Sequence, residues 1–316
     1  MDTSRRVLAH EAQHLLRVIR GCFLYFFLPL LVVLAAIHFP YDTDASGATP
    51  RSATNFYEAA YRPTSRPQQG VDYEETAARV AEAKNVEGQI RQFVSDYRLQ
   101  DKRVLDVGSG RGYLQDMVTD YTGLDLSSKV APYYHKPFVV GSATAMPFAD
   151  NSFDAAWTVW VIEHIPEPEK AFRELRRVIK PGGVLFLMVA WQATPWAADG
   201  FSVRPYGDFN VLGKLVKASI PLRNNVVFDE AHRIPVRLIR WMQYSVGGRE
   251  TSLHFRALQP NYDVYWQPDS DAAVSLDDFE AMLWFESRGD SCLNCRGTLN
   301  ELVTYTNPLI IRIDKK

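Results

Sequence analysis

Short apolar runs alternate with amphipathic stretches along most of the chain after residue 100. The apolar runs, closed by Gly, Pro or Asp residues, have the length of buried strands. They cover residues 104–107, 121–125, 138–140, 155–162, 184–189 and 309–313. Amphipathic stretches over residues 73–97, 112–119 and 168–178 predict helices between or before them. This order predicts an α/β fold, in which helices cover both faces of a doubly wound parallel sheet.

The first 40 residues follow a different pattern. Residues 21–39 carry no charged side chain and are almost wholly apolar. As a helix they would extend about 28 Å, close to the roughly 30 Å of a bilayer's hydrocarbon core. We therefore expect a transmembrane anchor helix over residues 21–39, after a basic segment over residues 1–20. A cleaved signal peptide and a buried core helix are the alternatives.

Residues 40–70 are rich in Asp, Ser, Gly, Thr, Pro and Gln. This composition predicts a flexible linker between the anchor and a folded domain over residues 71–316. Phe56, Tyr57 and Tyr61 interrupt the polar pattern. These aromatic residues either fold back over a cofactor pocket or cap the surface of the domain, and we favour the second interpretation.

Composition and charge narrow the function classes. The 316-residue chain is 47% hydrophobic and 23% charged, as in globular proteins. Its formal net charge of −2 argues against nucleic acid as the main partner, because nucleic-acid binding needs a strong basic excess. Nothing in the sequence indicates the oligomeric state.

Two of the three cysteines, Cys292 and Cys295, have the C-x-x-C spacing of metal sites. A structural zinc site needs about four protein ligands, and the chain has no second pair. We therefore expect no metal here, and either ordinary thiols or a local disulfide.

The most informative chemistry follows the first apolar run. That run leads to Asp106, and Gly108, Gly110 and Gly112 follow at alternate positions. Glycine lets the backbone approach a bound ligand closely, because it has no Cβ. A dinucleotide-binding loop has the spacing G-x-G-x-x-G, whereas the third glycine here falls one position early. The spacing therefore favours a different nucleotide-like ligand.

The second apolar run ends in Asp125, about twenty residues after the glycine loop. A carboxylate in this position can accept hydrogen bonds from both hydroxyls of a ribose. The alternative role is that of a helix N-cap, for which Ser127 and Ser128 are competing candidates. We expect Asp125 to bind a ribose.

The motifs together resemble class I S-adenosylmethionine (SAM)-dependent methyltransferases. D-x-G-x-G-x-G over residues 106–112 is similar to the first motif of that family. Residues 153–187 are similar to the FD…EH…P…ELRRVLKPGG run of its small-molecule group called type 11. The resemblance covers roughly residues 100–190. It implies a Rossmann-like, doubly wound sheet of the seven-stranded methyltransferase type, SAM as the cofactor and methyl transfer as the activity.

The resemblance also implies a cofactor site at the carboxyl ends of the strands. Asp106 is expected near the ammonium group of SAM, where a carboxylate complements the charge. Ser142 stands where the family usually has an acidic residue that contacts adenine, and the backbone N–H of Ala143 is a further candidate contact. The expected cofactor-binding residues are Asp106, Gly108, Ser109, Gly110, Gly112, Asp125, Leu126, Ser142, Ala143 and Glu163.

Glu163 and His164 follow the fourth apolar run, at the mouth of the expected site. A neutral imidazole can take a proton from a hydroxyl or an acidic carbon, so His164 is the candidate catalytic base. A base is needed only when the acceptor must lose a proton, because the sulfonium of SAM is already activated. The alternative is that His164 only packs at the strand end. Glu163 either binds loop backbone or takes part in chemistry.

Residues 190–250 are expected to form an insertion before the last elements of the domain. Residues 204–241 hold seven Lys or Arg residues against three acidic ones. A basic amphipathic segment can lie on an anionic membrane surface or form a lid over a substrate. We expect a lid that sets acceptor specificity, with membrane contact as a compatible addition.

We therefore expect a membrane-anchored SAM-dependent methyltransferase that acts on a small molecule, a lipid or a lipid-linked glycan. By the positive-inside rule, Arg17 and Arg20 before the apolar segment place the N-terminus in the cytoplasm and the domain on the opposite side of the membrane. SAM is made in the cytoplasm, so the sequence does not decide on which side of the membrane the domain lies. The alternative function is a catalytically degenerate, SAM-binding interaction module at a membrane. A nicotinamide-dependent reductase is a more distant alternative.

Overall fold

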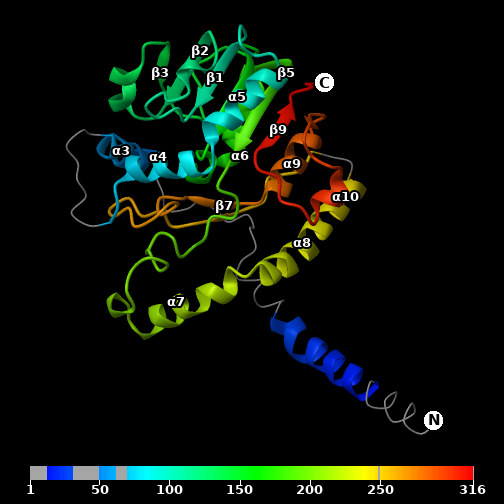
Figure 1. The fold of residues 1–316 in the computed structure, drawn as a ribbon. Coiled ribbons are helices and arrows are strands. Elements are labelled where there is room, and N and C mark those ends of the chain that lie inside the picture. Colours follow the sequence, from blue (N-terminus) through cyan, green and yellow to red (C-terminus); the bar gives the residue numbers. More distant parts are fainter. Residues whose placement is uncertain (1–12, 31–49, 62–69, 248–249, 316) are drawn as a thin grey trace.

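The computed structural model describes residues 13–30, 50–61, 70–247 and 250–315. A seven-stranded sheet forms its centre, in the order β3-β2-β1-β4-β5-β9-β8 (Figure 1). Its strands are β1 (Arg103–Val107), β2 (Asp120–Asp125), β3 (Phe138–Val140), β4 (Phe153–Val159), β5 (Ile179–Met188), β8 (Ser291–Cys292) and β9 (Leu309–Arg312). The strands from β1 to β5 are parallel, whereas β9 runs antiparallel to β5 and to β8. The structure confirms the expected α/β architecture, with an antiparallel strand added to the parallel sheet.

The two faces of the sheet carry separate hydrophobic cores. Side chains alternate between the faces along each strand, so that Leu105 packs on one face and Val104 on the other. Helix α5 (Val86–Asp96) covers the face of Val104. Helices α6 (Pro168–Val178) and α9 (Asp278–Glu286) cover the face of Leu105. Both cores therefore hold the carboxyl ends of β1, β2 and β4 in fixed positions.

Two predicted helices differ in detail. The single helix expected over residues 73–97 is divided into α4 (Tyr73–Ala83) and α5, because Asn85 takes a left-handed backbone conformation with φ of 50°. The helix expected over residues 112–119 is reduced to a 3-10 turn over Gln115–Met117. Sequence spacing identified the helical stretches but not these interruptions.

The predicted transmembrane helix is wrong. Among the described residues, no helix is both long enough and apolar enough to cross a membrane. The described N-terminal helix covers residues 13–30, with a π-helical segment over Phe23–Phe27, and its first part includes Arg17 and Arg20. Its uncharged part, residues 21–30, extends about 15 Å, half of a bilayer's hydrocarbon thickness. Residues 31–39 of the predicted segment lie outside the described residues, and the expected single-pass localisation is not supported.

The predicted linker also contains a helix. Residues Pro50–Ala60 form α3, which lies beside α4 in Figure 1. Its Phe56 packs against Tyr262, with ring centroids 5.4 Å apart, and Tyr57 packs against Tyr73 at 6.0 Å. These aromatic contacts explain why a polar, proline-containing stretch is ordered here. Residues 31–49 and 62–69 lie outside the described residues.

The region after β5 contains two long helices, α7 (Val211–Arg223) and α8 (Val226–Gly247), and a small sheet of β6 (Phe255–Ala257) and β7 (Val274–Leu276). The basic residues of α8 are not a solvated face. Arg237 is 2% exposed and pairs with Asp277 and Asp278, and Arg240 pairs with Glu280 of α9. Buried ion pairs therefore neutralise much of the local basic excess.

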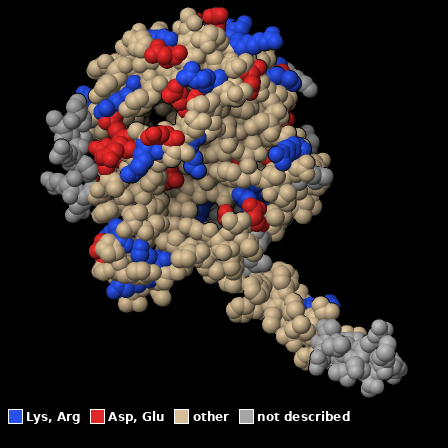
Figure 2. Space-filling model, in the orientation of Figure 1, with Lys and Arg blue, Asp and Glu red and all other residues tan. Residues whose placement is uncertain are grey.

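Charge on the outer surface is mixed. On the face shown in Figure 2, acidic and basic side chains lie interspersed over the body of the molecule, while uncharged side chains cover most of the N-terminal helix at the lower right. This distribution agrees with the formal net charge of −2.

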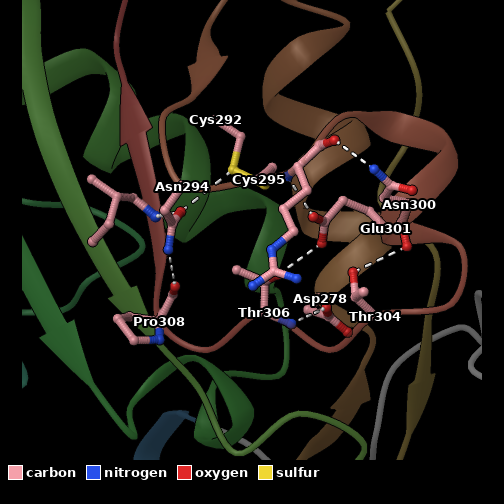
Figure 3. Close-up of a disulfide and its surroundings, with 11 residues drawn as sticks. Asp278, Cys292, Asn294, Cys295, Asn300, Glu301, Thr304, Thr306 and Pro308 are labelled. Atoms are coloured by element: carbon pink, nitrogen blue, oxygen red, sulfur yellow. Dashed lines mark hydrogen bonds between the residues drawn. A yellow bond between two sulfur atoms is a disulfide. The ribbon is translucent and has the colours of Figure 1, made fainter.

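The C-x-x-C pair forms a disulfide between Cys292 and Cys295 (Figure 3). The structure thus decides between the two expected states of these cysteines. Between them, Asn294 donates to the carbonyl oxygen of Pro308 at 2.8 Å and accepts from the backbone N–H of Ile310 at 2.9 Å. These hydrogen bonds hold the disulfide loop against the start of β9. Helix α10 (Thr298–Glu301) follows this loop in the chain.

Candidate functional site

Two cavities open where the strands β1, β2 and β4 end. The first has a volume of about 770 Å³ and reaches Asp125, and we call it the Asp125 cavity. The second has a volume of about 790 Å³ and reaches Asp106, and we call it the Asp106 cavity. Both are lined by the same five residues where they meet, namely Tyr61, Tyr73, Gly108, Trp160 and His164. The two cavities are therefore adjacent, and we call the five shared residues the junction.

The glycine loop has a backbone that other residues would strain. Gly108, Gly110 and Gly112 have φ angles of 71°, 50° and 70°, in the left-handed region that favours glycine. A Cβ added at Gly108 would lie 2.2 Å from a methyl carbon of Val161. One added at Gly112 would lie 2.8 Å from the ring of Tyr134. The loop thus needs glycine both for its conformation and for its packing.

Asp125 anchors this loop to the end of β2. One carboxylate oxygen accepts the backbone N–H of Gly110 at 2.8 Å, and the other accepts the backbone N–H of Ser127 at 2.9 Å. Burial raises the pKa of Asp125, although these backbone N–H groups oppose the shift. Each carboxylate oxygen has further acceptor capacity, so the side chain can also accept ribose hydroxyls. The predicted competitor Ser127 caps the 3-10 segment that follows.

The residues expected to contact adenine lie in the same cavity. Leu126, Ser142 and Ala143 line the Asp125 cavity together with Thr144. The hydroxyl of Ser142 lies 2.8 Å from the hydroxyl of Thr144. Two hydroxyls therefore stand where the family usually has a carboxylate.

Asp106 lies in the other cavity with Ser109 and Gly110. It is 4% exposed and accepts a hydrogen bond from the Tyr121 hydroxyl at 2.8 Å. Burial raises its pKa to about 7, and the hydrogen bond from Tyr121 only partly offsets this. A cationic ligand group nearby would favour the ionised carboxylate.

Glu163 has a different setting from the other predicted residues. It is fully buried, lines neither cavity, and accepts the backbone N–H of Ala190 at 3.1 Å. Burial raises its pKa to about 7, against the effect of His164. Glu163 therefore joins the end of β4 to the end of β5. Gly112 also lines neither cavity and shapes the loop instead.

His164 lies at the junction of the cavities. Its Nδ1 is 3.4 Å from a carboxylate oxygen of Asp271, and its Nε2 is 4.0 Å from Glu163. Burial lowers the pKa of the imidazole, but Asp271, Glu163 and Asp269 raise it, and the net direction is upward. Ligand atoms of Glu163, His164 and Asp269 lie within 4.8 Å of one another. We assign no metal to them, because acidic groups often gather without one.

Sequence reasoning missed several residues of the junction. Tyr57 and Tyr61 were expected to cap the surface, but both line the Asp125 cavity. Their position as aromatic residues in a polar stretch was the available signal. Asp269 and Asp271 come from the segment between β6 and β7, which carries no motif that would have identified them.

A third cavity of about 400 Å³ adjoins the predicted insertion. Residues of α7 and α8, among them Arg223, Val226 and Arg233, line it. Trp191 and Tyr305 line both this cavity and the Asp106 cavity. The cavity beside the α7–α8 turn is thus adjacent to the Asp106 cavity, which His164 also lines.

Comparison with known proteins agrees with this geometry. A family model described as a methyltransferase domain matches residues 105–187, the segment that supplies the glycine loop, Asp125 and His164. A demethylmenaquinone methyltransferase of Renibacterium salmoninarum is 41% identical over 27% of this chain and 39% of its own length.

Two further relatives match a similar share of the chain. A malonyl-[acyl-carrier protein] O-methyltransferase of Erwinia pyrifoliae is 39% identical over 27% of this chain and 36% of its own length. A sterol 24-C-methyltransferase of Gibberella zeae is 34% identical over 29% of this chain and 28% of its own length. The chain thus spans well under half the length of these relatives. Residues 105–187, with the glycine loop and the sheet to which they contribute, therefore form a methyltransferase domain of the class I type, which uses S-adenosylmethionine as the methyl donor.

Proposed function

We propose that this chain transfers the methyl group of SAM to a small-molecule or lipid-type acceptor, with His164 as the base. The observation that carries the proposal is the junction of the two cavities at His164. The Asp125 cavity offers a ribose acceptor and the hydroxyls of Ser142 and Thr144. The Asp106 cavity offers a buried carboxylate for an ammonium group. The reactive sulfonium of SAM lies between its nucleoside and its amino-acid part, which places the transfer near the junction.

The protein's part in the reaction is mainly alignment. Bound SAM supplies an activated methyl group, so the enzyme needs to hold an acceptor in line with it. Tyr61, Tyr73 and Trp160 line the junction and can exclude water from it. His164 takes the acceptor's proton when that acceptor is a hydroxyl or an acidic carbon. Its raised pKa increases its basicity and also its protonated fraction near neutral pH.

We propose that residues 190–250 form the part of the site that selects the acceptor. The third cavity connects this region to the junction through Trp191 and Tyr305. On α7, Val211, Leu215 and Leu222 form an exposed apolar row, with 76%, 63% and 44% exposure. This row supports an apolar acceptor, including a lipid or lipid-linked glycan at a membrane surface. The relatives named for demethylmenaquinone and sterol also support an apolar acceptor.

The test is transfer of a labelled methyl group from SAM into fractionated membrane lipids and soluble metabolites. We expect one fraction to become labelled with the native chain, and at least a hundredfold less label with His164→Ala. The control is His135→Ala, because His135 is an exposed histidine that lines none of the three cavities. Tight SAM binding without label in any fraction would instead favour the catalytically degenerate interaction module.

A further inference from the structure

Helix α3 lies outside the segment matched by the methyltransferase family model, yet it contacts the site at two points. The Tyr57 hydroxyl donates to Asp271 at 2.8 Å. The Glu58 carboxylate accepts the backbone N–H of Ser128 at 2.7 Å, three residues after Asp125. The hydroxyl of Tyr61, the residue that directly follows α3, lies 3.3 Å from where a Cβ of Gly110 would be. The helix and the residue after it therefore lie against the glycine loop, the segment after β2 and the surroundings of His164.

Asp271 connects α3 to His164. Its side chain is fully buried, and the oxygen that accepts the Tyr57 hydroxyl is the one 3.4 Å from His164 Nδ1. Its other oxygen is buried and has no hydrogen-bond partner within the described structure. Tyr57 and His164 also pack edge to face, with ring centroids 6.4 Å apart. The three side chains form a chain of contacts from α3 to the imidazole.

A carboxylate beside one ring nitrogen decides where the imidazole carries its proton. It favours the tautomer with the proton on the near nitrogen, which leaves the other nitrogen free to accept a proton. For His164 the near nitrogen is Nδ1, which is buried and makes no hydrogen bond within the described structure, so the Asp271 carboxylate acts on it through its charge at 3.4 Å. The Tyr57 hydroxyl restrains the carboxylate, because it occupies the same oxygen from the other side.

We infer that Asp271, held by Tyr57, is a positioning residue that sets the tautomer and orientation of His164, and that α3 is thereby part of the catalytic unit. The inference rests on the proposed role of His164 as the base. It assigns to α3 a function that its polar sequence does not indicate.

Ionisable groups other than Asp271 also lie near His164. Glu163 belongs to the same 3-10 turn, and Asp269 and Asp271 come from the segment before β7. Tyr57 approaches from α3 and titrates far above neutral pH, since burial and Asp271 raise its pKa. Replacement of Asp271 leaves Glu163 and Asp269 in place, so the effect of one carboxylate can be separated from theirs.

The experiment is nitrogen-15 and carbon-13 NMR of histidine-labelled full-length protein across a pH titration. His164→Gln identifies the His164 signals among the seven histidines. In the native chain we expect neutral His164 to carry its proton on Nδ1. Asp271→Asn should lower the pKa of His164 by about one pH unit or more and shift the proton toward Nε2.

Tyr57→Phe keeps the ring and removes the restraint on Asp271, so we expect a mixture of the two tautomers. Tyr262→Phe is the matched control, because the Tyr262 hydroxyl belongs to the same aromatic cluster and is buried without a hydrogen bond. It should leave the His164 signals unchanged. If Asp271→Asn does not fold, the comparison of Tyr57→Phe with Tyr262→Phe tests whether the Tyr57–Asp271 contact sets the tautomer of His164.

The inference is overturned if folded Asp271→Asn protein keeps the native tautomer and pKa of His164, or if Tyr57→Phe and Tyr262→Phe give the same spectra. SAM affinity, measured by calorimetry on the same samples, tests the proposed function separately. A native chain that does not bind SAM refutes that function, whereas the tautomer of His164 is read without any ligand.

Discussion

Replacement of Gly108 by alanine tests the fit of the glycine loop, and Gly182 provides a matched control. Gly108 and Gly182 both have positive φ angles, 71° and 79°. A Cβ at Gly182 meets nothing within 4 Å, whereas a Cβ at Gly108 would lie 2.2 Å from Val161. The two substitutions therefore share the backbone strain, and only Gly108→Ala adds a steric clash.

The expected magnitudes follow from these two effects. The left-handed conformation costs an alanine about 1–2 kcal/mol, which is the whole effect expected for Gly182→Ala. Overpacking against Val161 adds about 1–3 kcal/mol, so Gly108→Ala should lower the free energy of unfolding by about 2–5 kcal/mol. Gly108 also lines both cavities, so its shifted loop should weaken SAM binding at least tenfold.

Urea unfolding and calorimetric titration with SAM measure the two effects. Gly182→Ala should be slightly destabilised and bind SAM as the native chain does. Equal losses of stability in the two variants, together with native SAM affinity in Gly108→Ala, would refute the argument that the loop is shaped by close packing around a ligand.

Three further predictions concern stability, pH and the loop contacts of α3. Arg237→Met removes the ion-pair partner of Asp277 and Asp278 in the core and should lower the free energy of unfolding, measured in urea, by about 3–5 kcal/mol. Arg312→Met, at an exposed ion pair, should not change it measurably. Equal losses in the two variants would contradict the burial of the Arg237 pairs. Burial raises the pKa of Asp106 and of Glu163 to about 7. Between about pH 4 and pH 7 the folded state therefore binds more protons than the unfolded state, and the free energy of unfolding should fall as the pH rises through this range. Asp106→Asn should make that decline shallower in urea unfolding at several pH values, and an unchanged slope would contradict the assignment. Glu58→Ala should weaken SAM binding several-fold by calorimetry, while Asp96→Ala, at an exposed position of α5 outside both cavities, should not. Equal affinities would contradict a contact of α3 with the cofactor site.

The central sheet and the cofactor side of the site could be predicted from local sequence. Strand-length apolar runs identified β1 to β5, and the spacing of three glycines with Asp125 identified the loop and its anchor. These features are local, because each depends on residues close together in the chain. The order and direction of β8 and β9 depend on tertiary packing that no periodicity records.

The acceptor side could not be predicted in the same way. His164 was identified from its position after a strand, but its partners Tyr57 and Asp271 are 214 residues apart in the chain. The basic excess of residues 204–241 suggested a membrane-facing segment or a lid, whereas the structure pairs Arg237 and Arg240 of α8 with acidic residues at the start of α9. Residues 21–39 suggested a membrane anchor because this segment, taken alone, is uncharged and apolar. The described N-terminal helix begins earlier, in a part of the sequence that contains charged residues.

Calorimetric titration of SAM into the native chain and into Asp125→Ala tests the central claim most directly. The native chain should bind one SAM molecule. Loss of the charged hydrogen bonds, at about 1.5–3 kcal/mol, should weaken binding by about ten- to a hundredfold in Asp125→Ala. Asp120→Ala, at the exposed opposite end of β2, should bind as the native chain does. Failure of the native chain to bind SAM, or native affinity in Asp125→Ala, would contradict the account.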